Sequence, residues 1–484
     1  MLGILLNDPS YEQDIRELMM AFYPGETFAH EKQDEVRMYV EGVYNGAGEF
    51  CLRMLCDDRT EDERTFQLDY SNRLAAKTAI KRELYNMLSK RTGKELPWGT
   101  LTGIRPTKIA LTRLYEGWTE DEIRKYMADT YLTSREKIDL SVEIAEREKN
   151  LLSRVDYENG YSLYVGIPFC PTTCLYCSFT SFPIGAWRGK MQLYLEALFK
   201  ELEYVAHQMK GKTLDTIYFG GGTPTALEAE ELDAILTKIE ETFDLSAVKE
   251  FTVEAGRPDS ITEEKLRTLR AHGITRISIN PQTMKQATLD LIGRRHTVEK
   301  VKEQFRLARE LGFDNINMDL IIGLPEEDIN DVRDTMEQIR ELAPDSVTVH
   351  SLAIKRAARL NIFRERYAGL KIENTQEMID LTASCARSMG LVPYYLYRQK
   401  NMAGNFENVG YAAPDKECIY NILIMEERQT IVACGAGTTT KVIFPKENRL
   451  ERVENVKDVE QYISRIDEMI ERKQKMLEKL EGLS

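Results

Sequence analysis

The segment Tyr161-Ser-Leu-Tyr-Val-Gly-Ile-Pro-Phe-Cys-Pro-Thr-Thr-Cys-Leu-Tyr-Cys177 joins a short, mostly apolar run to three closely spaced cysteines. The apolar run predicts a buried strand over Ser162–Ile167. Cys170, Cys174 and Cys177 follow directly, so their thiolates lie together on one loop at the end of that strand. Three neighbouring sulfur ligands suit a cuboidal 4Fe-4S cluster, whose thiolates bind adjacent irons.

No fourth cysteine accompanies this loop, since the next ones along the chain are Cys56 and Cys385. A four-iron cluster held here would therefore keep one iron open to a ligand that is not protein. A structural zinc site is an alternative, but such sites usually show a second pair of Cys or His ligands, and none follows here. A disulfide is disfavoured because the chain shows no secretory signal.

Length and composition set the broad class of the protein. A chain of 484 residues is too long for one ordinary core and predicts two or three domains. The formal net charge of −14 argues against a general affinity for nucleic acid, which needs a concentrated basic surface. Neither a leader peptide nor an apolar run of membrane-spanning length is present, so we expect a cytoplasmic protein without membrane insertion.

The central part of the chain alternates short apolar runs with amphipathic helical patterns, which is typical of repeated βα units around a parallel sheet. The predicted strands are Ser162–Ile167, Leu214–Phe219, Glu250–Ala255, Thr275–Ile279, Asn315–Ile321 and Ser346–His350. Met191–Met209 shows helical spacing, and Ser260 with Glu263 suggests a capping box for another helix. We expect an α/β protein with an incomplete (β/α)6 barrel; an open doubly wound sheet is the alternative.

Three domains are expected on this basis. Residues 1–150 form an accessory α+β domain that ends in a helical connector, Glu120–Leu152. Residues 151–355 form the (β/α)6 core. Residues 356–484 form a mainly helical C-terminal region that ends in a charged helix, Val456–Leu483.

Polar and glycine residues stand where the predicted strands end. Gly220-Gly-Gly-Thr-Pro224 follows the second strand, and glycines let the backbone approach a ligand without interference from a Cβ atom. The other strand ends carry Glu254, Asn280, Gln282, Asp319, Gly323, His350 and Ala353. Because the carboxyl ends of parallel strands meet at one mouth, these groups together favour a polar ligand site there.

Several of these motifs occur in an order found in a known family. They are Tyr164-x-x-Ile-Pro-Phe-Cys170, Gly220–Thr225, Thr252-Val-Glu254, Ile277-Ser-Ile-Asn-Pro-Gln282, Arg294 and Asn317-Met-Asp-Leu-Ile-Ile-Gly-Leu-Pro325. The chain resembles the oxygen-independent coproporphyrinogen III dehydrogenases of the radical S-adenosylmethionine (SAM) superfamily. Within that HemN-like group it looks most like the HemZ branch.

The resemblance implies roles for particular residues. Cys170, Cys174 and Cys177 would hold a 4Fe-4S cluster, and SAM would chelate its open iron. Tyr164, Gly221 and Glu254 would line that SAM molecule. The residues that match a second SAM position in the group are Tyr176, Gly222, Thr223, Gln282, Arg294, Asp319, Ile321 and Ala353.

The resemblance also implies a reaction. A radical derived from SAM would oxidatively decarboxylate propionates of coproporphyrinogen III to vinyl groups and give protoporphyrinogen IX. The implied partners are a tetrapyrrole substrate, a one-electron donor such as flavodoxin or ferredoxin, and an electron acceptor. The substrate carboxylates need cationic partners, for which the candidates are Arg294, Arg295, His296, Lys355, Arg356, Arg359, Arg398 and Lys400.

The chain departs from the family pattern at Phe179, where the classical dehydrogenases carry a further cysteine. The His-Asn-x-x-Tyr-Trp pattern of related haem chaperones does not occur either. Two other functions therefore stay open: a haem-binding chaperone of the same lineage, and another radical SAM reaction on a tetrapyrrole, such as methyl transfer or ring opening.

Overall fold

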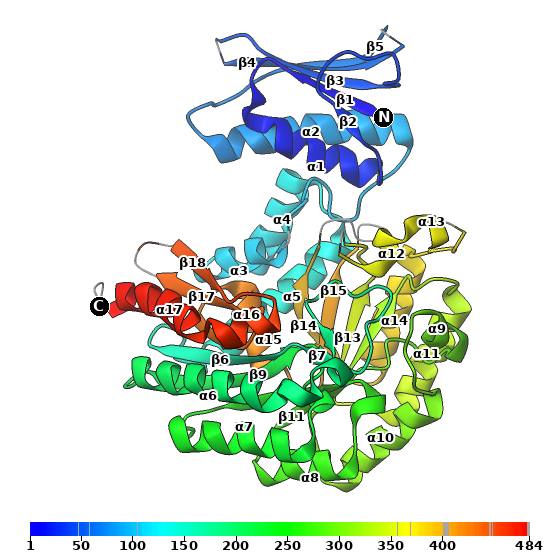
Figure 1. Ribbon diagram of the computed structural model, residues 1–484. Coiled ribbons are helices and arrows are strands. Elements are labelled where there is room, and N and C mark those ends of the chain that lie inside the picture. The colour runs from blue at the N-terminus through cyan, green and yellow to red at the C-terminus, as the bar shows by residue number, and fades with distance from the viewer. Residues whose placement is uncertain are drawn as a thin grey trace. The chain divides into compact units, whose positions relative to one another are not determined.

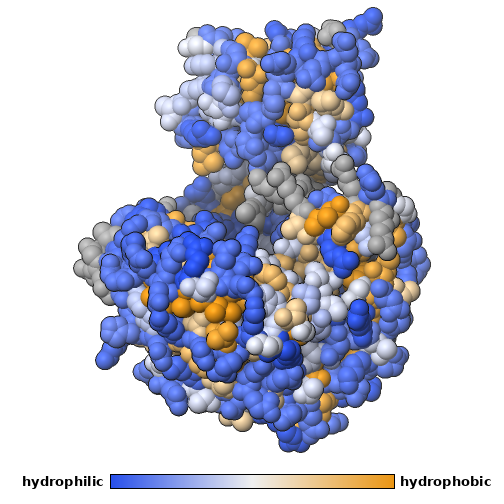
Figure 2. All heavy atoms as spheres, viewed as in Figure 1, coloured by the Kyte–Doolittle hydropathy of each residue, from blue (hydrophilic) through white to orange (hydrophobic). Residues whose placement is uncertain are grey.

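The computed structural model describes residues 1–481 except 47, 58, 104, 356, 368, 400–405, 445, 446 and 448 (Figure 1). Two compact units account for the described chain. The first comprises Met1–Glu146 together with a short later segment that begins at Arg398, and the second comprises the rest, from Arg147 onward. The face shown in Figure 2 is hydrophilic over most of its area, with smaller apolar patches between.

The first unit contains a five-stranded sheet with the order β2-β1-β3-β4-β5. Its elements are β1 (Leu2–Leu6), α1 (Glu12–Phe22), β2 (Phe28–Ala29), β3 (Tyr39–Tyr44), β4 (Glu49–Cys56), β5 (Arg59–Gln67) and α2 (Arg73–Thr92). The helices α1 and α2 pack on one another beside the sheet (Figure 1). Asn72 begins α2, because its side chain accepts a hydrogen bond from the Ala75 amide, and Gly93 ends it with φ 66°.

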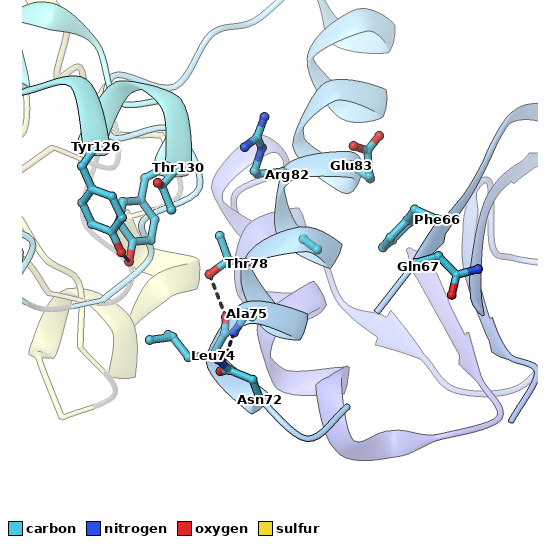
Figure 3. A pocket seen from close by; sticks show the side chains of 12 residues that line it. Phe66, Gln67, Asn72, Leu74, Ala75, Thr78, Arg82, Glu83, Tyr126 and Thr130 are labelled. Atoms are coloured by element: carbon cyan, nitrogen blue, oxygen red, sulfur yellow. Dashed lines mark hydrogen bonds between the residues drawn. The ribbon is translucent and has the colours of Figure 1, made fainter. Parts of the chain in front are cut away.

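The helices that follow are α3 (Thr107–Tyr115), α4 (Glu120–Tyr131) and α5 (Arg135–Leu152). The predicted connector is therefore two helices, because Leu132 takes a left-handed conformation with φ 56° and ends α4. A pocket of about 520 Å³ lies between the end of β5, α2 and α4 (Figure 3). None of the residues that the sequence predicts for a site lines it.

The second unit is built around six parallel strands, which are the six that the sequence predicts. They are β6 (Gly160–Ile167), β9 (Thr213–Gly221), β10 (Glu250–Gly256), β11 (Arg276–Ile279), β12 (Ile316–Ile322) and β13 (Ser346–Ser351). They neighbour one another in sequence order, and each pair is parallel. The sheet has two free ends and does not close, so the expected α/β fold with an incomplete barrel is confirmed.

Helices connect successive strands and cover one side of this sheet (Figure 1). They are α6 (Met191–Gln208), α7 (Ala229–Thr242), α8 (Glu263–Ala271), α9 (Gln286–Leu291), α10 (Val298–Glu310) and α11 (Ile329–Leu342). The predicted capping box at Ser260 is wrong. Thr262 is the N-cap of α8, because its side chain accepts from the Lys265 amide, whereas the Ser260 hydroxyl donates to backbone carbonyls before the helix.

The C-terminal region, for which the sequence predicts mainly helical structure, also contains strands that the sequence did not predict. The helices of its described part are α12 (Arg359–Ile362), α13 (Arg364–Tyr367), α14 (Gln376–Ser388), α15 (Ile419–Glu426), α16 (Val459–Ser464) and α17 (Ile466–Glu481). The strands are β14 (Val392–Tyr397), β15 (Asn408–Ala412), β16 (Thr430–Cys434), β17 (Thr439–Phe444) and β18 (Arg449–Glu454). These strands extend both edges of the parallel sheet: β16 pairs with β6, and β15 pairs with β13. A six-stranded open sheet leaves backbone N–H and C=O groups unpaired along both edges, and the added strands provide hydrogen-bond partners for them.

The charged helix that the sequence predicts at the C-terminus is interrupted at Arg465, which separates α16 from α17. A fully buried ion pair ties α17 to α6: Lys473 Nζ lies 2.5 Å from Glu201 Oε1. Tyr462 Oη and the Gly435 amide donate to the other oxygen of Glu201. No helix of the described chain combines the length and apolar character that a bilayer crossing requires.

Candidate functional site

The three cysteines lie on the loop that leaves β6. The short strand β7 (Phe169–Cys170) pairs with β8 (Phe182–Pro183) and closes the base of this loop. Farther along, the Leu175 amide donates to Ile292 O at 2.9 Å, and the Thr172 hydroxyl donates to Gly293 O at 3.2 Å. The loop is therefore held by segments that follow the later strands of the sheet.

The thiols of this loop lie in a partly desolvated environment. Cys174 is buried, and Cys170 and Cys177 are half-buried. Burial raises the pKa of Cys170, and it raises the pKa of Cys177 to about 11. The Thr223 hydroxyl lies 3.5 Å from Cys170 Sγ. All eight cysteines are free thiols, so no disulfide competes for the three sulfurs.

Within the described chain, no three His, Cys, Asp or Glu side chains converge as the ligands of one metal ion do. In a closed zinc site, by contrast, all of the ligands meet at a single ion. A cuboidal cluster makes another demand, because each thiolate binds a different iron. The donor set of this loop, three thiols with no fourth protein ligand beside them, fits such a cluster.

The glycine run packs directly against the cysteine loop. The amides of Gly222 and Thr223 donate to Ile167 O and Phe169 O, each at 2.7 Å. A Cβ atom on Gly222 would lie 2.5 Å from Phe169 O, so a side chain there would push the two segments apart. Gly221 is exposed and has φ 103°, which leaves its backbone open to a ligand.

Side chains on the inner face of the sheet continue the site below this mouth. Tyr164 on β6 pairs in register with Tyr218 on β9, and their rings stack with centroids 6.1 Å apart. Tyr420 of α15 stacks on Tyr218 at 4.4 Å. Tyr218 Oη donates to Glu254 Oε1 at 2.6 Å. Burial, together with the nearby Asp319 carboxylate, raises the pKa of Glu254 to about 7 despite that hydrogen bond.

Asp319 lies on the same face but in a different electrostatic setting. Asn317 Nδ2 donates to Asp319 Oδ1 at 2.7 Å, and His350 Nε2 lies 3.9 Å from Oδ2. Burial acts to raise the pKa of Asp319, but His350 and Asn317 outweigh it, so this pKa lies below its usual value. Tyr397 Oη lies 3.3 Å from His350 Nδ1. The site therefore contains one carboxyl group that gains or loses its proton near neutrality and one that is ionised there.

Gln282 and Arg294 come from loops that follow β11. Gln282 has φ 69°, and its backbone forms a bridge to β12: its amide donates to Asp319 O, and its carbonyl accepts from the Ile321 amide. Arg294 is buried and donates to Asn280 O at 2.5 Å and to Tyr176 Oη at 3.2 Å. These contacts bring Arg294, which is remote in sequence, against Tyr176 on the cysteine loop.

The remaining predicted residues lie at the same end of the sheet. Ile321 is buried near the end of β12 in register with His350, and Ala353 is half-buried just after β13. The structure thus brings all of the predicted cofactor-binding residues to the inner face or the mouth of one sheet. Their contacts with a ligand remain predictions.

The predicted basic groups do not form one cluster. Arg295 is exposed, whereas Arg294 already donates hydrogen bonds to Asn280 and Tyr176. Burial lowers the pKa of His296 to about 4, so its ring is neutral. Lys355 lies over the ring of exposed Phe179 at 5.6 Å. Arg359 begins α12, and Arg398 donates to Leu101 O within the first unit. Arg356 and Lys400 lie outside the described residues.

Sequence reasoning missed three residues of this site: Tyr218, Arg257 and Tyr420. Tyr218 could have been found from the alternation along β9, because it lies two positions before Gly220 on the same face. Arg257 follows β10 and contacts the cysteine loop through Thr172. No local pattern marks Tyr420, because it reaches the site from a helix in the C-terminal region.

Comparison with known proteins places these features in a family. The family model described as the radical SAM superfamily matches residues 164–339. The chain is 40% identical to the oxygen-independent coproporphyrinogen-III oxidase-like protein HemZ of Bacillus subtilis over 456 residues, which is 93% of this chain and 89% of that protein. The chain belongs to this coproporphyrinogen-III oxidase-like family of radical SAM proteins.

Two further comparisons concern a similar sequence and a similar solved structure. The haem chaperone HemW of Lactococcus lactis is 31% identical over 284 residues, 57% of this chain and 69% of that protein. The structure of coproporphyrinogen III oxidase HemN from Escherichia coli aligns with 66% of this chain and 72% of its own, with a TM-score of 0.52 and 24% identity. That likeness concerns the fold. Radical SAM proteins use a 4Fe-4S cluster and SAM, and these are the cofactors of this family.

Proposed function

We propose that this protein is a radical SAM oxidoreductase that converts propionate side chains of coproporphyrinogen III to vinyl groups, giving protoporphyrinogen IX. The observation that carries this proposal is the continuity of the relationship to HemZ, which spans both structural units and the whole site. The contact between the cysteine loop, the glycine run and the carboxyl-bearing inner face supports it.

Cys170, Cys174 and Cys177 would hold the cluster, and Tyr164, Gly221 and Glu254 would line the SAM molecule at its open iron. Residues that match a second SAM position are Tyr176, Gly222, Thr223, Gln282, Arg294, Asp319, Ile321 and Ala353. When bound, the cluster and SAM supply a 5′-deoxyadenosyl radical, which is the cofactors' own chemistry. The protein's contribution is to bind, orient and exclude water.

The protein's own residues prepare the site for a cationic, hydroxyl-rich ligand. Exposed Gly221 presents backbone groups at the mouth, and Tyr218 orients Glu254 through a hydrogen bond of 2.6 Å. Glu254 has a pKa of about 7, so its carboxyl group gives up its proton readily when a cation or a hydrogen-bond donor approaches. The stacked rings of Tyr164, Tyr218 and Tyr420 limit the access of water from below.

The proposed reaction balances with two external partners. Conversion of one propionate to a vinyl group would remove a hydrogen atom from the β-carbon, one carbon dioxide and one electron; the radical that bound SAM supplies would take the hydrogen atom. One electron from a donor such as flavodoxin or ferredoxin is needed for each SAM cleaved, and an acceptor takes the electron that leaves the substrate. Arg295, Lys355 and Arg359, which are exposed and belong to the basic residues that the sequence predicts, are the groups to which we assign the substrate carboxylates.

Anaerobic turnover followed by mass spectrometry tests the proposal. Reconstituted protein, a reductant and SAM are incubated with coproporphyrinogen III, and the products are expected to be lighter by one carbon dioxide and two hydrogens per converted propionate. 5′-Deoxyadenosine should accumulate in step. The variant Cys174→Ala should lose the cluster and both products, whereas Cys385→Ala, outside the loop, should retain them. Formation of the products without consumption of SAM would refute the proposal. Failure of cluster-loaded protein to form the products would refute it as well.

A second candidate function is haem binding as a chaperone, which the relationship to HemW favours. In that case loaded protein would bind haem tightly and form no vinyl porphyrin. Titration with haem, followed by its Soret absorbance, separates this function from the first. A product that retains all its carboxyl groups but gains a methyl group or an opened ring would indicate a different radical reaction on the tetrapyrrole.

A further inference from the structure

A buried arginine lies behind the cysteine loop. Arg257 follows β10 and is only 3% exposed. Its Nη1 atom donates to Thr172 O at 2.9 Å and to Thr172 Oγ1 at 2.7 Å, and it lies 3.8 Å from Cys174 Sγ. Nη1 of this guanidinium therefore contacts a backbone carbonyl, a hydroxyl and a thiol of the same loop.

The rest of the guanidinium is fixed by one carboxylate. Arg257 Nε donates to Asp259 Oδ1 at 2.9 Å, and Nη2 donates to Asp259 Oδ2 at 2.6 Å. Such a two-pronged pairing fixes the plane of the guanidinium, so Nη1 is aimed at the loop. Asp259 lies on the side of Arg257 away from the thiol contact, which gives the pair a positive end toward Cys174.

The other groups around this pair do not cancel that field. His296 Nδ1 lies 3.9 Å from Asp259 Oδ1, and neither ring nitrogen has a hydrogen-bond partner. Arg294 adds a second buried cation, which contacts Tyr176 on the same loop. Because the site is desolvated, charges here act more strongly on one another than they would in water.

We propose that Arg257, oriented by Asp259, is a positioning residue that shapes the cysteine loop and raises the reduction potential of the cluster through Cys174. Hydrogen bonds and positive charge near the sulfurs stabilise the reduced, more negative state of an iron–sulfur cluster. The inference rests on the proposed assignment of the three cysteines and goes beyond it, because it concerns how easily the bound cluster accepts an electron.

The test uses opposite charge changes on the two partners. Arg257→Gln removes the cation, and Asp259→Asn removes the anion while it keeps the size of the side chain. Arg267→Gln, on exposed Arg267 of α8, is the matched control. The readouts are the iron and sulfide content per chain and the midpoint potential from a dye-mediated titration monitored by electron paramagnetic resonance, without SAM.

At a fixed solution potential, Arg257→Gln should lower the ratio of reduced to oxidised cluster about tenfold, which corresponds to a midpoint potential lower by about 59 mV for a one-electron couple. Asp259→Asn should raise that ratio, and Arg267→Gln should leave it unchanged. A purely structural role would not produce shifts of opposite sign. Equal potentials in wild type and loaded Arg257→Gln, or shifts of the same sign in both variants, would overturn the inference.

Failure to load the cluster is also informative. If Arg257→Gln holds no iron, Asp259→Asn decides alone: a raised potential supports the inference, and an unchanged or lowered one refutes it. Wild-type protein that carries neither iron nor sulfide would instead refute the proposed cluster site. The two failures are thus distinguishable in the same set of samples.

Discussion

Replacing Glu254 by Gln should stabilise the metal-free protein at pH 8 and leave it almost unchanged at pH 4.5. Glu254 has a pKa of about 7 because it is desolvated beside Asp319, and the buried Arg276 only partly compensates. Tyr164, Tyr218 and Tyr420 are the other titratable groups that face it. Gln keeps an oxygen that accepts the hydrogen bond from Tyr218, and it carries no charge.

The sign and size of the effect follow from linkage between proton binding and folding. The pKa is raised from 4.5 to about 7, so the folded state binds the proton more tightly than the unfolded state does. Stability therefore falls as the pH rises from about 4.5 to about 7. The difference between these two pKa values corresponds to about 3 kcal/mol of folding free energy, which Glu254→Gln should recover above pH 7. For a unit of this size, that is a rise in Tm of about 5 °C.

Thermal unfolding of metal-free wild type and variant at pH 4.5 and pH 8 provides the measurement. Glu264→Gln, on an exposed residue of α8, serves as the control and should not change Tm at either pH. The difference between Glu254→Gln and wild type should shrink as the pH falls. A variant that is less stable than wild type at pH 8, or a difference independent of pH, would show that Glu254 is not held in a desolvated, partly protonated state.

Two further perturbations test the packing that supports the site. Gly222→Ala should displace the cysteine loop, because its Cβ would meet Phe169 O at 2.5 Å; iron loading should fall and stability should drop by about 1–3 kcal/mol, whereas Gly189→Ala, which has open space, should be neutral in both assays. Lys473→Met should cost about 3–5 kcal/mol, because it leaves the buried Glu201 carboxylate without its cation. Adding Glu201→Gln to that variant should restore most of the loss in urea unfolding; an additive double variant would contradict the pairing.

Local sequence patterns predicted the parallel sheet well, for reasons visible in particular residues. Each strand of the core is short and apolar and is followed by an amphipathic helix, so period and length together identify it. The start of α8 shows the limit of this approach. Ser260 and Thr262 are both competent N-caps by sequence, and the structure selects Thr262 because the Ser260 hydroxyl is bonded to Ala255 O and Arg257 O.

The C-terminal strands were missed because their partners are remote in sequence. Strand β16 pairs with β6, roughly 270 residues earlier, and no local pattern reports a pairing over that distance. The same applies to Tyr420, whose ring joins the stack on Tyr218 from a helix in the C-terminal region. Sequence-based prediction captures periodicity, whereas the choice of neighbour depends on which edges and faces remain open after the core has formed.

The sequence by itself determined the chemistry that this protein can offer: three thiols at one spacing, a glycine run beside them, and polar groups at the ends of six strands. The tertiary structure decided how those groups behave. Burial beside Asp319 gives Glu254 its pKa of about 7, and two hydrogen bonds from Arg257 to Asp259 direct Arg257 Nη1 toward Cys174. Residue identity fixes which atoms are present, but desolvation and orientation depend on packing between distant segments, which no local pattern encodes.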